Sequence, residues 1–260
     1  MIKLRERISS LLRGRPLTAP VFRNIRSSML LGSFHTSESN IMQQFTVPGT
    51  IAIDIGANVG QYTHVLSRLV KNSGYVMAFE PNPSAFRELV LGSRGRRIWP
   101  FEVALSSTDG IGCLTSPVSP TFEELIQLGT LNPHLSNNIV KQIQVTTNRL
   151  DKYLPIMHLR VSFIKIDVEG HEYEVLTGAE KLIAKHKPTM VIEIEHRHQP
   201  NGRDAETTIN WLKSRGMVVE GILGKKLISS TEALERQHAM QADVTRLKIS
   251  YTNNFLCRFA

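Results

Sequence analysis

Short apolar runs alternate with helical spacings of apolar residues over most of the chain after residue 50. The runs have the length of strands and lie at 51–55, 75–79, 98–103, 161–167 and 189–194. Helical patterns begin at Gly60 and Pro83, and two more cover about 173–185 and 203–215. Such alternation is typical of βαβ units on a parallel sheet. Because the strands are apolar throughout, we expect helices on both faces of the sheet.

Later strands and two irregular regions complete the pattern. We predict final strands at 217–222 and 254–259, and an exposed strand at 143–147. Residues 1–46 show two helical spacings separated by prolines and are predicted to form a basic helical arm, while 47–260 form the main domain. The stretch 115–142 is rich in Pro, Ser, Thr and Asn, with a short helical pattern at 122–128. We interpret it as an insertion near the substrate site.

Length and composition limit the class of protein. A chain of 260 residues with 41% hydrophobic residues can bury a sizeable core without metal or disulfide crosslinks. Cys113 and Cys257 form no spaced motif, which favours a reducing compartment, and we expect a cytoplasmic protein. No apolar run is long enough to cross a membrane, and no secretory signal is predicted.

The net charge of +8 is concentrated in the arm. Residues 1–35 hold seven Lys and Arg and one Glu, a net +6, which leaves +2 for residues 36–260. A nearly neutral main domain does not require nucleic acid as a partner. We interpret the basic face of the arm as a solvated surface. Contact with a membrane surface, contact with nucleic acid and a transit peptide are the alternatives.

A turn with two glycines follows the first strand, in the sequence Asp54-Ile-Gly-Ala-Asn-Val-Gly60. Open α/β sheets bind ligands at the carboxyl ends of their strands. Gly56 permits a close approach of backbone to ligand, and Asn58 adopts the left-handed conformation more readily than most residues. The start of the next helix favours a carboxylate, and Asp54 suits a ligand that also carries an ammonium group. The glycine spacing differs from the G-x-G-x-x-G fingerprint of NAD enzymes.

An acid, Glu80, stands at the end of the second strand, before Pro81-Asn-Pro83. A carboxylate in this place can accept hydrogen bonds from both hydroxyls of a ribose. A ligand with an amino acid at one end and a nucleoside at the other fits both turns, and S-adenosylmethionine is such a ligand. The alternative is a plain strand-to-helix turn in which the glycines serve geometry alone.

Several motifs in order resemble those of the FkbM-type methyltransferases. The resemblance extends over about residues 50–196. The motifs are DIGANVG at 54–60, AFEPNP at 78–83, VALS at 103–106 with DG at 109–110, LD at 150–151, KIDVEGHE at 165–172 and VLTGAE at 175–180.

This resemblance implies a class I, Rossmann-like S-adenosylmethionine-dependent methyltransferase. The implied α/β fold is a doubly wound, mostly parallel seven-stranded sheet whose last strand is antiparallel. The implied reaction is O-methylation of a hydroxyl on a sugar, a glycolipid or a secondary metabolite. The implied cofactor-binding residues are the methionine-end loop, the ribose-binding acid with its neighbour, and the adenine contact: Asp54, Gly56, Asn58, Gly60, Glu80, Asn82 and Ala104.

The turn after the strand at 161–167 carries acid–base groups, in the sequence Asp167-Val-Glu-Gly-His-Glu172. Methyl transfer requires that the acceptor oxygen be aligned and its proton removed. His171 is suited to general-base work at neutral pH, and Asp167 or Glu169 could do the same or orient the acceptor. We predict these three residues as a catalytic group and leave their individual roles open.

A metal is not part of the predicted site. Asp167, Glu169 and Glu193 could nevertheless supply the oxygen ligands that a hard cation prefers. Lys165 lies inside an apolar strand and needs a partner, and we expect Glu193 to be that partner.

Two other functions remain as alternatives. A nucleic-acid methyltransferase would fit the isoelectric point near 9.7. However, no aromatic residues are interleaved with the basic ones, and the chain has Asp-Val-Glu-Gly where enzymes acting on base amines often carry Asn-Pro-Pro-Tyr. The other alternative is a non-catalytic protein that binds S-adenosylmethionine. The expected partner is a hydroxylated small molecule or saccharide, with no nucleic acid, and membrane contact only through the arm. The oligomeric state is left open.

Overall fold

The computed structural model describes residues 37–117, 140–195, 198, 204–242 and 252–260. The compact unit that contains them begins at Thr36. The predicted helices of the arm within residues 1–36 and the short helix at 122–128 lie outside the described residues. No helix in the described part of the chain is long and apolar enough to cross a bilayer.

The central sheet is mostly parallel, as predicted, and its strands follow the order β10-β9-β11-β8-β7-β1-β2-β3. From β8 to β3 every neighbouring pair is parallel, while β11 runs antiparallel to both β8 and β9. The strands are β1 (Ile51–Ile55), β2 (Tyr75–Phe79), β3 (Ile98–Phe101), β7 (Val161–Ile166), β8 (Thr189–Glu193), β9 (Met217–Leu223), β10 (Lys226–Ser229) and β11 (Asn254–Phe259).

The prediction of seven strands was wrong by one, because β10 adds an eighth at the edge. Leu223 pairs with Lys226 across a two-residue turn that starts at Gly224, whose φ of 60° lies in the left-handed region. Glycine adopts this conformation without steric cost, so the chain reverses there. The strand is short and mostly exposed, and its sequence therefore lacks the apolar run by which the other strands were predicted.

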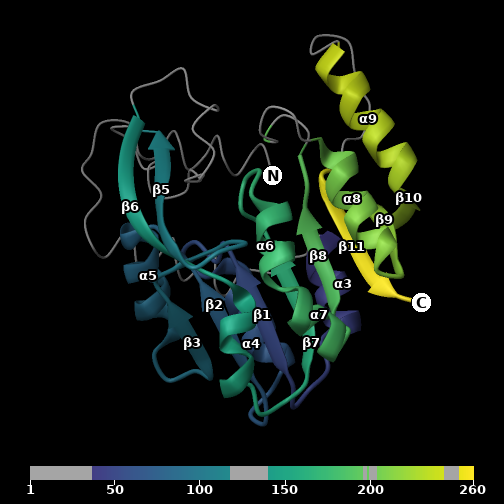
Figure 1. The fold of residues 1–260 in the computed structure, drawn as a ribbon. Helices are drawn as coiled ribbons and strands as arrows, with labels where there is room; N and C mark the ends of the chain where they lie inside the picture. The colour runs from purple at the N-terminus through teal and green to yellow at the C-terminus, as the bar shows by residue number, and fades with distance from the viewer. Residues whose placement is uncertain (1–36, 118–139, 196–197, 199–203, 243–251) are drawn as a thin grey trace, which may run out of the picture. The chain divides into compact units, whose positions relative to one another are not determined.

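Helices cover both faces of the sheet, as Figure 1 shows. Side chains alternate along β1, so that Ile53 belongs to one apolar cluster and Ala52 to the other. The Ala52 cluster includes residues of α3, α4 and α5, and the Ile53 cluster includes residues of η3, α6, α7, α8 and α9. The helices are α3 (Ser37–Phe45), α4 (Gln61–Leu69), α5 (Pro83–Ser93), η3 (Leu150–Ile156), α6 (Glu172–Gly178), α7 (Glu180–His186), α8 (Ala205–Ser214) and α9 (Ser230–Ala242).

A second, three-stranded sheet follows β3 in the chain and has the order β4-β6-β5. It consists of β4 (Ala104–Leu105), β5 (Gly110–Pro117) and β6 (Val140–Asn148), and the predicted strand at 143–147 is thus part of β6. Every residue of β5 pairs antiparallel with a residue of β6, and the two strands lie side by side in Figure 1. The ends of the predicted insertion therefore form paired strands, and its centre, 118–139, lies outside the described residues.

Candidate active site

The turns after β1, β2 and β7 meet at the carboxyl edge of the sheet. The Gly56 N–H donates to the Phe79 carbonyl at 3.0 Å, and the Asp167 N–H donates to the Ile55 carbonyl at 3.0 Å. These bonds continue the parallel ladders beyond the strand ends. The turns that carry Gly56, Glu80 and Asp167 consequently lie side by side, although they are far apart in the sequence.

The first turn requires glycine at Gly56. Its φ is 76°, and a Cβ built there would lie only 1.8 Å from the carbonyl oxygen of Asp167. Asn58 is also left-handed, with a φ of 49°, and Gly60 precedes α4 with a φ of 95°. The turn therefore follows a path that few side chains permit, packed directly against the turn after β7.

Asp54 lies beneath this turn and is almost fully buried. Its Oδ2 accepts a hydrogen bond from Thr63 Oγ1 in α4 at 2.5 Å. Burial raises the pKa of Asp54 to about 6, although the Thr63 hydrogen bond and the nearby Lys165 charge act in the opposite direction. Asp54 thus holds the start of α4 in place through Thr63. Burial, the hydrogen bond and the Lys165 charge together determine whether its carboxyl group carries a charge.

Glu80 connects the first two turns. Its Oε2 accepts the Asn58 N–H and its Oε1 accepts the Asn82 N–H, each at 2.7 Å. The residue is 6% exposed, and burial raises its pKa to about 7 despite these two bonds. A carboxylate has about four lone-pair positions, so each oxygen keeps acceptor capacity for a hydroxyl.

Two of the predicted cofactor residues serve the local fold. The Asn82 side chain caps α5, because its Oδ1 accepts the N–H groups of Ser84 and Ala85 at 2.9 and 3.4 Å. Pro83, which fills the first helical position, completes this helix start. Ala104 lies buried in β4 and pairs with Thr147 of β6, where it offers a small apolar surface.

The turn after β7 packs against the segment that follows β8. Glu169 is left-handed with a φ of 50°, and its carboxylate forms an ion pair with His198 Nδ1. At Gly170 a Cβ would lie 1.9 Å from the His198 carbonyl oxygen. The backbone of this turn is therefore fixed by contacts on two sides, with Gly56 on one and His198 on the other.

The three predicted catalytic residues divide into two places. Metal-ligand atoms of Asp167, Glu169 and Glu193 lie within 4.8 Å of one another. His171 instead faces Ser106, and its Nε2 lies 2.9 Å from Ser106 Oγ. Asp167 Oδ1 is buried and has no hydrogen-bond partner among the described residues, so it can accept a bond from a ligand hydroxyl.

Lys165 is fully buried, and its partner differs from the prediction. Its ammonium pairs with Asp167 at 3.5 Å and donates to Asn254 Oδ1 at 3.3 Å, whereas Glu193 accepts from Asn253. Residues i and i+2 of a strand project to the same face, which explains the Asp167 pair. Burial alone would lower the pKa of Lys165, but the charges of Asp167 and Glu193 outweigh it and raise that pKa.

The edge of the sheet also holds a group with metal-ligand chemistry. Glu169 belongs to two sets, one with Asp167 and Glu193 and one with Glu195 and His198. Carboxylate and imidazole are ligand types that divalent cations accept. Burial raises the pKa of Glu193, and the negative charge of Asp167 raises it further. A proton bound to Glu193 can therefore reduce the negative charge that these carboxylates share.

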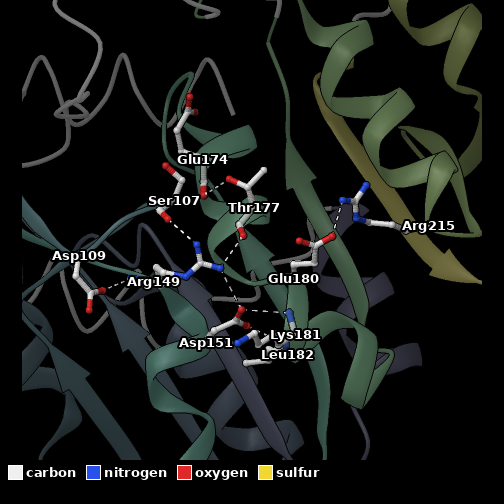
Figure 2. A network of polar contacts seen from close by, with 10 residues as sticks. All are labelled: Ser107, Asp109, Arg149, Asp151, Glu174, Thr177, Glu180, Lys181, Leu182 and Arg215. Atoms are coloured by element: carbon white, nitrogen blue, oxygen red, sulfur yellow. Dashed lines mark hydrogen bonds and ion pairs between the residues drawn. The ribbon is translucent and has the colours of Figure 1, made fainter.

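An arginine that the sequence reasoning missed ties β6, the turn after β4 and α6 together (Figure 2). Arg149 donates to the carbonyl of Ser107 at 2.7 Å and to that of Thr177 at 3.3 Å, and it pairs with Asp151 at 3.4 Å. The backbone N–H of Arg149 donates to Asp109 Oδ1 at 2.8 Å. Asp151 and Asp109, which belong to the LD and DG motifs at 150–151 and 109–110, are thus both partners of Arg149.

The fold, a mostly parallel sheet with antiparallel β11 between β8 and β9, is that of a class I methyltransferase. Comparison with known families then identifies the chain more closely. The family described as the methyltransferase FkbM domain matches residues 54–219, and the chain belongs to it. The resemblance seen in the sequence is thereby confirmed.

Two similar proteins add detail. The chain is 28% identical over 131 residues to the hexuronic acid methyltransferase AglP of Haloferax volcanii, a match that covers 48% of each protein. The crystal structure of methyltransferase FkbM from Methylobacillus flagellatus KT aligns with a TM-score of 0.50 at 16% identity, over 88% of this chain and 52% of that one. The chain thus spans about half the length of these relatives.

Proposed function

We propose that this methyltransferase uses S-adenosylmethionine to methylate a hydroxyl of a saccharide or glycolipid. The observation that carries the proposal is the Glu80 carboxylate, buried at the end of β2 and bonded through both oxygens to the turns beside it. Each of the two carboxylate oxygens keeps a lone pair that can accept a further hydrogen bond, and the hydrogen bonds to the turns fix where the two oxygens lie. Two acceptors on one carboxylate suit the vicinal hydroxyls of a ribose.

The cofactor's other end would lie at the first turn. The turn through Gly56, Asn58 and Gly60 leads into α4, whose N-terminal end would lie close to a ligand carboxylate, and Asp54 beneath the turn favours a nearby ammonium. Ala104 would pack against the base. Asn82 would act through its backbone and its helix cap. When bound, the cofactor supplies a methyl group activated by its sulfonium.

On the acceptor side we assign roles to the turn after β7. Asp167 Oδ1 can accept a hydrogen bond from a second hydroxyl of a saccharide acceptor, because nothing in the described chain donates to it. Lys165 pairs with the other Asp167 oxygen and so fixes the position of this carboxylate. Glu169 is held by His198, so it shapes the wall of the site, and His171 is the group to receive the proton.

One relative supports the class of acceptor. AglP is named a hexuronic acid methyltransferase, and this chain is 28% identical to it over 131 residues. A methyl-transfer screen over neutral and acidic saccharides, with the products located by mass spectrometry, tests this assignment. We expect a methyl ether on a saccharide hydroxyl. Transfer only to RNA or to a protein side chain would contradict it.

Asp167→Asn is the variant that separates chemistry from cofactor binding. We expect it to keep cofactor affinity and lose at least about 100-fold in kcat, since orientation of the acceptor typically contributes that much. Glu206→Gln, an exposed change on α8, serves as the control. Full turnover in Asp167→Asn would contradict the role given to this carboxylate.

A further inference from the structure

The two nitrogens of the His171 ring are held by side chains from different segments. Nε2 lies 2.9 Å from Ser106 Oγ, in the turn after β4, and Nδ1 lies 3.6 Å from Glu174 Oε2, in the first turn of α6. Ser106 is 8% exposed, and the side chains of His171 and Glu174 are 18% and 20% exposed. The ring is thus mostly enclosed, with a hydroxyl on one side and a carboxylate on the other.

Backbone contacts fix the turn that carries Ser106 relative to α6. A Cβ on Gly178 would lie 2.0 Å from the Ser106 carbonyl oxygen, so α6 packs directly on the Ser106 turn. Arg149 bonds to the Ser107 carbonyl on one side and to the Thr177 carbonyl on the other, as Figure 2 shows. The placement of Ser106 relative to His171 and Glu174 is therefore built into the fold.

We propose that Glu174 and Ser106 are positioning residues for His171, an inference that rests on the proposed function. A carboxylate beside Nδ1 favours the tautomer that carries its proton on Nδ1, and it stabilises the imidazolium once formed. At 3.6 Å the Glu174 contact acts through charge more than through a hydrogen bond. The tautomer leaves the lone pair on Nε2, and the Ser106 hydroxyl donates to it and fixes the direction of the ring.

The reaction step follows from this arrangement. In the reactive complex the acceptor hydroxyl takes the place of the Ser106 hydroxyl as the donor to Nε2. The acceptor oxygen forms its bond to the methyl carbon while the bond between sulfur and that carbon breaks. The acceptor proton moves to Nε2, the electron pair of the broken bond stays on sulfur, and the positive charge moves to His171 beside the Glu174 carboxylate.

Nitrogen NMR of the imidazole rings tests the positioning without any turnover. With uniformly ¹⁵N-labelled protein at pH 8.5, the His171 signals are assigned by their loss in His171→Gln. We expect the neutral ring to carry its proton on Nδ1 in the wild type, and a mixture of tautomers in Glu174→Gln. A wild-type ring protonated on Nε2, or an unchanged tautomer in Glu174→Gln, would overturn the proposal.

Kinetics separate this inference from the proposed function. For Glu174→Gln we expect kcat to fall by about 10- to 100-fold, with the acceptor KM changed less than about twofold. For Ser106→Ala we expect a smaller fall in kcat, because the acceptor hydroxyl replaces the Ser106 hydroxyl in the reactive complex. Ser106→Thr, which keeps the hydroxyl, should restore most of the loss. Glu180→Gln, in the next helix and paired with Arg215, and Ser214→Ala, in α8, are matched controls that should retain wild-type kcat.

Each outcome has its own meaning. Absence of methyl transfer in the wild type would contradict the proposed function, and the NMR experiment would still decide the positioning. Transfer in the wild type with an unchanged kcat in Glu174→Gln would overturn the positioning and leave the function standing. Unfolding midpoints of all variants, measured alongside, show whether a loss of kcat comes from a loss of fold.

Discussion

At the scale of single residues, the site is built from carboxylates that the fold buries. Asp54 and Glu80 lie at adjacent strand ends, and burial raises their pKa values to about 6 and about 7. Each accepts hydrogen bonds from neighbouring groups, yet desolvation is the larger effect in both cases. The protein therefore holds protons at the edge of its sheet that an unfolded chain releases near pH 4.

A pH dependence of stability follows from these two groups. A carboxyl group whose pKa is higher in the folded state stabilises that state, and the full stabilisation is present at a pH below the pKa of the unfolded chain. This stabilisation is lost as the pH rises through the folded-state pKa values of about 6 and about 7. His186, whose pKa is lowered by burial, opposes this trend with a single group. We expect the unfolding midpoint without cofactor to fall between pH 5 and pH 8 at constant ionic strength, measured by calorimetry. A midpoint that rises over this range would contradict the burial argument.

Gly56 gives a second prediction at the residue scale. Gly56→Ala should destabilise the domain by at least about 2 kcal/mol, because a left-handed backbone and a contact with Asp167 oppose the new methyl together. Gly95→Ala is the matched control. Its φ of 71° is similar, but no atom lies within 4 Å of the added Cβ, so only about 1 kcal/mol of backbone cost remains. Denaturant unfolding of both variants measures the difference, and equal losses would show that the contact is unimportant.

At the scale of secondary-structure elements, the sequence predicted what local patterns encode. The apolar runs located β1, β2, β7 and β8. The ligand site expected at the turns that follow them stays a prediction. Side-chain partners from distant parts of the chain were harder to predict from the sequence. Lys165 pairs with Asp167 and Asn254 instead of Glu193, since side-chain partners across strands depend on register and on competing amides. His171 separates from Asp167 and Glu169 because it starts α6 and faces the turn after β4.

Arg149 tests how these elements are joined. Arg149→Met removes bonds to two backbone carbonyls and to Asp151, and we expect a loss of about 1–2 kcal/mol in the free energy of unfolding. Arg236→Met, which removes an i,i+4 pair with Glu232 on α9, should cost no more than about 0.5 kcal/mol. Urea unfolding compares the stability of the two variants. An Arg149 variant as stable as the Arg236 variant would show that the Arg149 contacts do not stabilise the fold.

At the scale of the whole molecule, the basic character and the site belong to different parts of the chain. Residues 1–35 account for a net +6 of the total +8, and every residue of the candidate site lies after residue 50. A protein that lacks residues 1–35 should keep its cofactor affinity within about twofold, because nothing in the site as described requires the arm. Calorimetric titration of the folded truncation checks this expectation. A large loss of affinity would assign part of the site to the arm.

The proposed function depends above all on one contact, the binding of S-adenosylmethionine by Glu80 at the turns after β1 and β2. Isothermal titration calorimetry on the wild type, on Glu80→Ala and on the exposed control Glu206→Ala measures the strength of that contact. We predict equal binding by the wild type and the control, and binding at least about tenfold weaker in Glu80→Ala, as the loss of charge-assisted hydrogen bonds implies. No binding by the wild type, or undiminished binding by Glu80→Ala, would contradict the account.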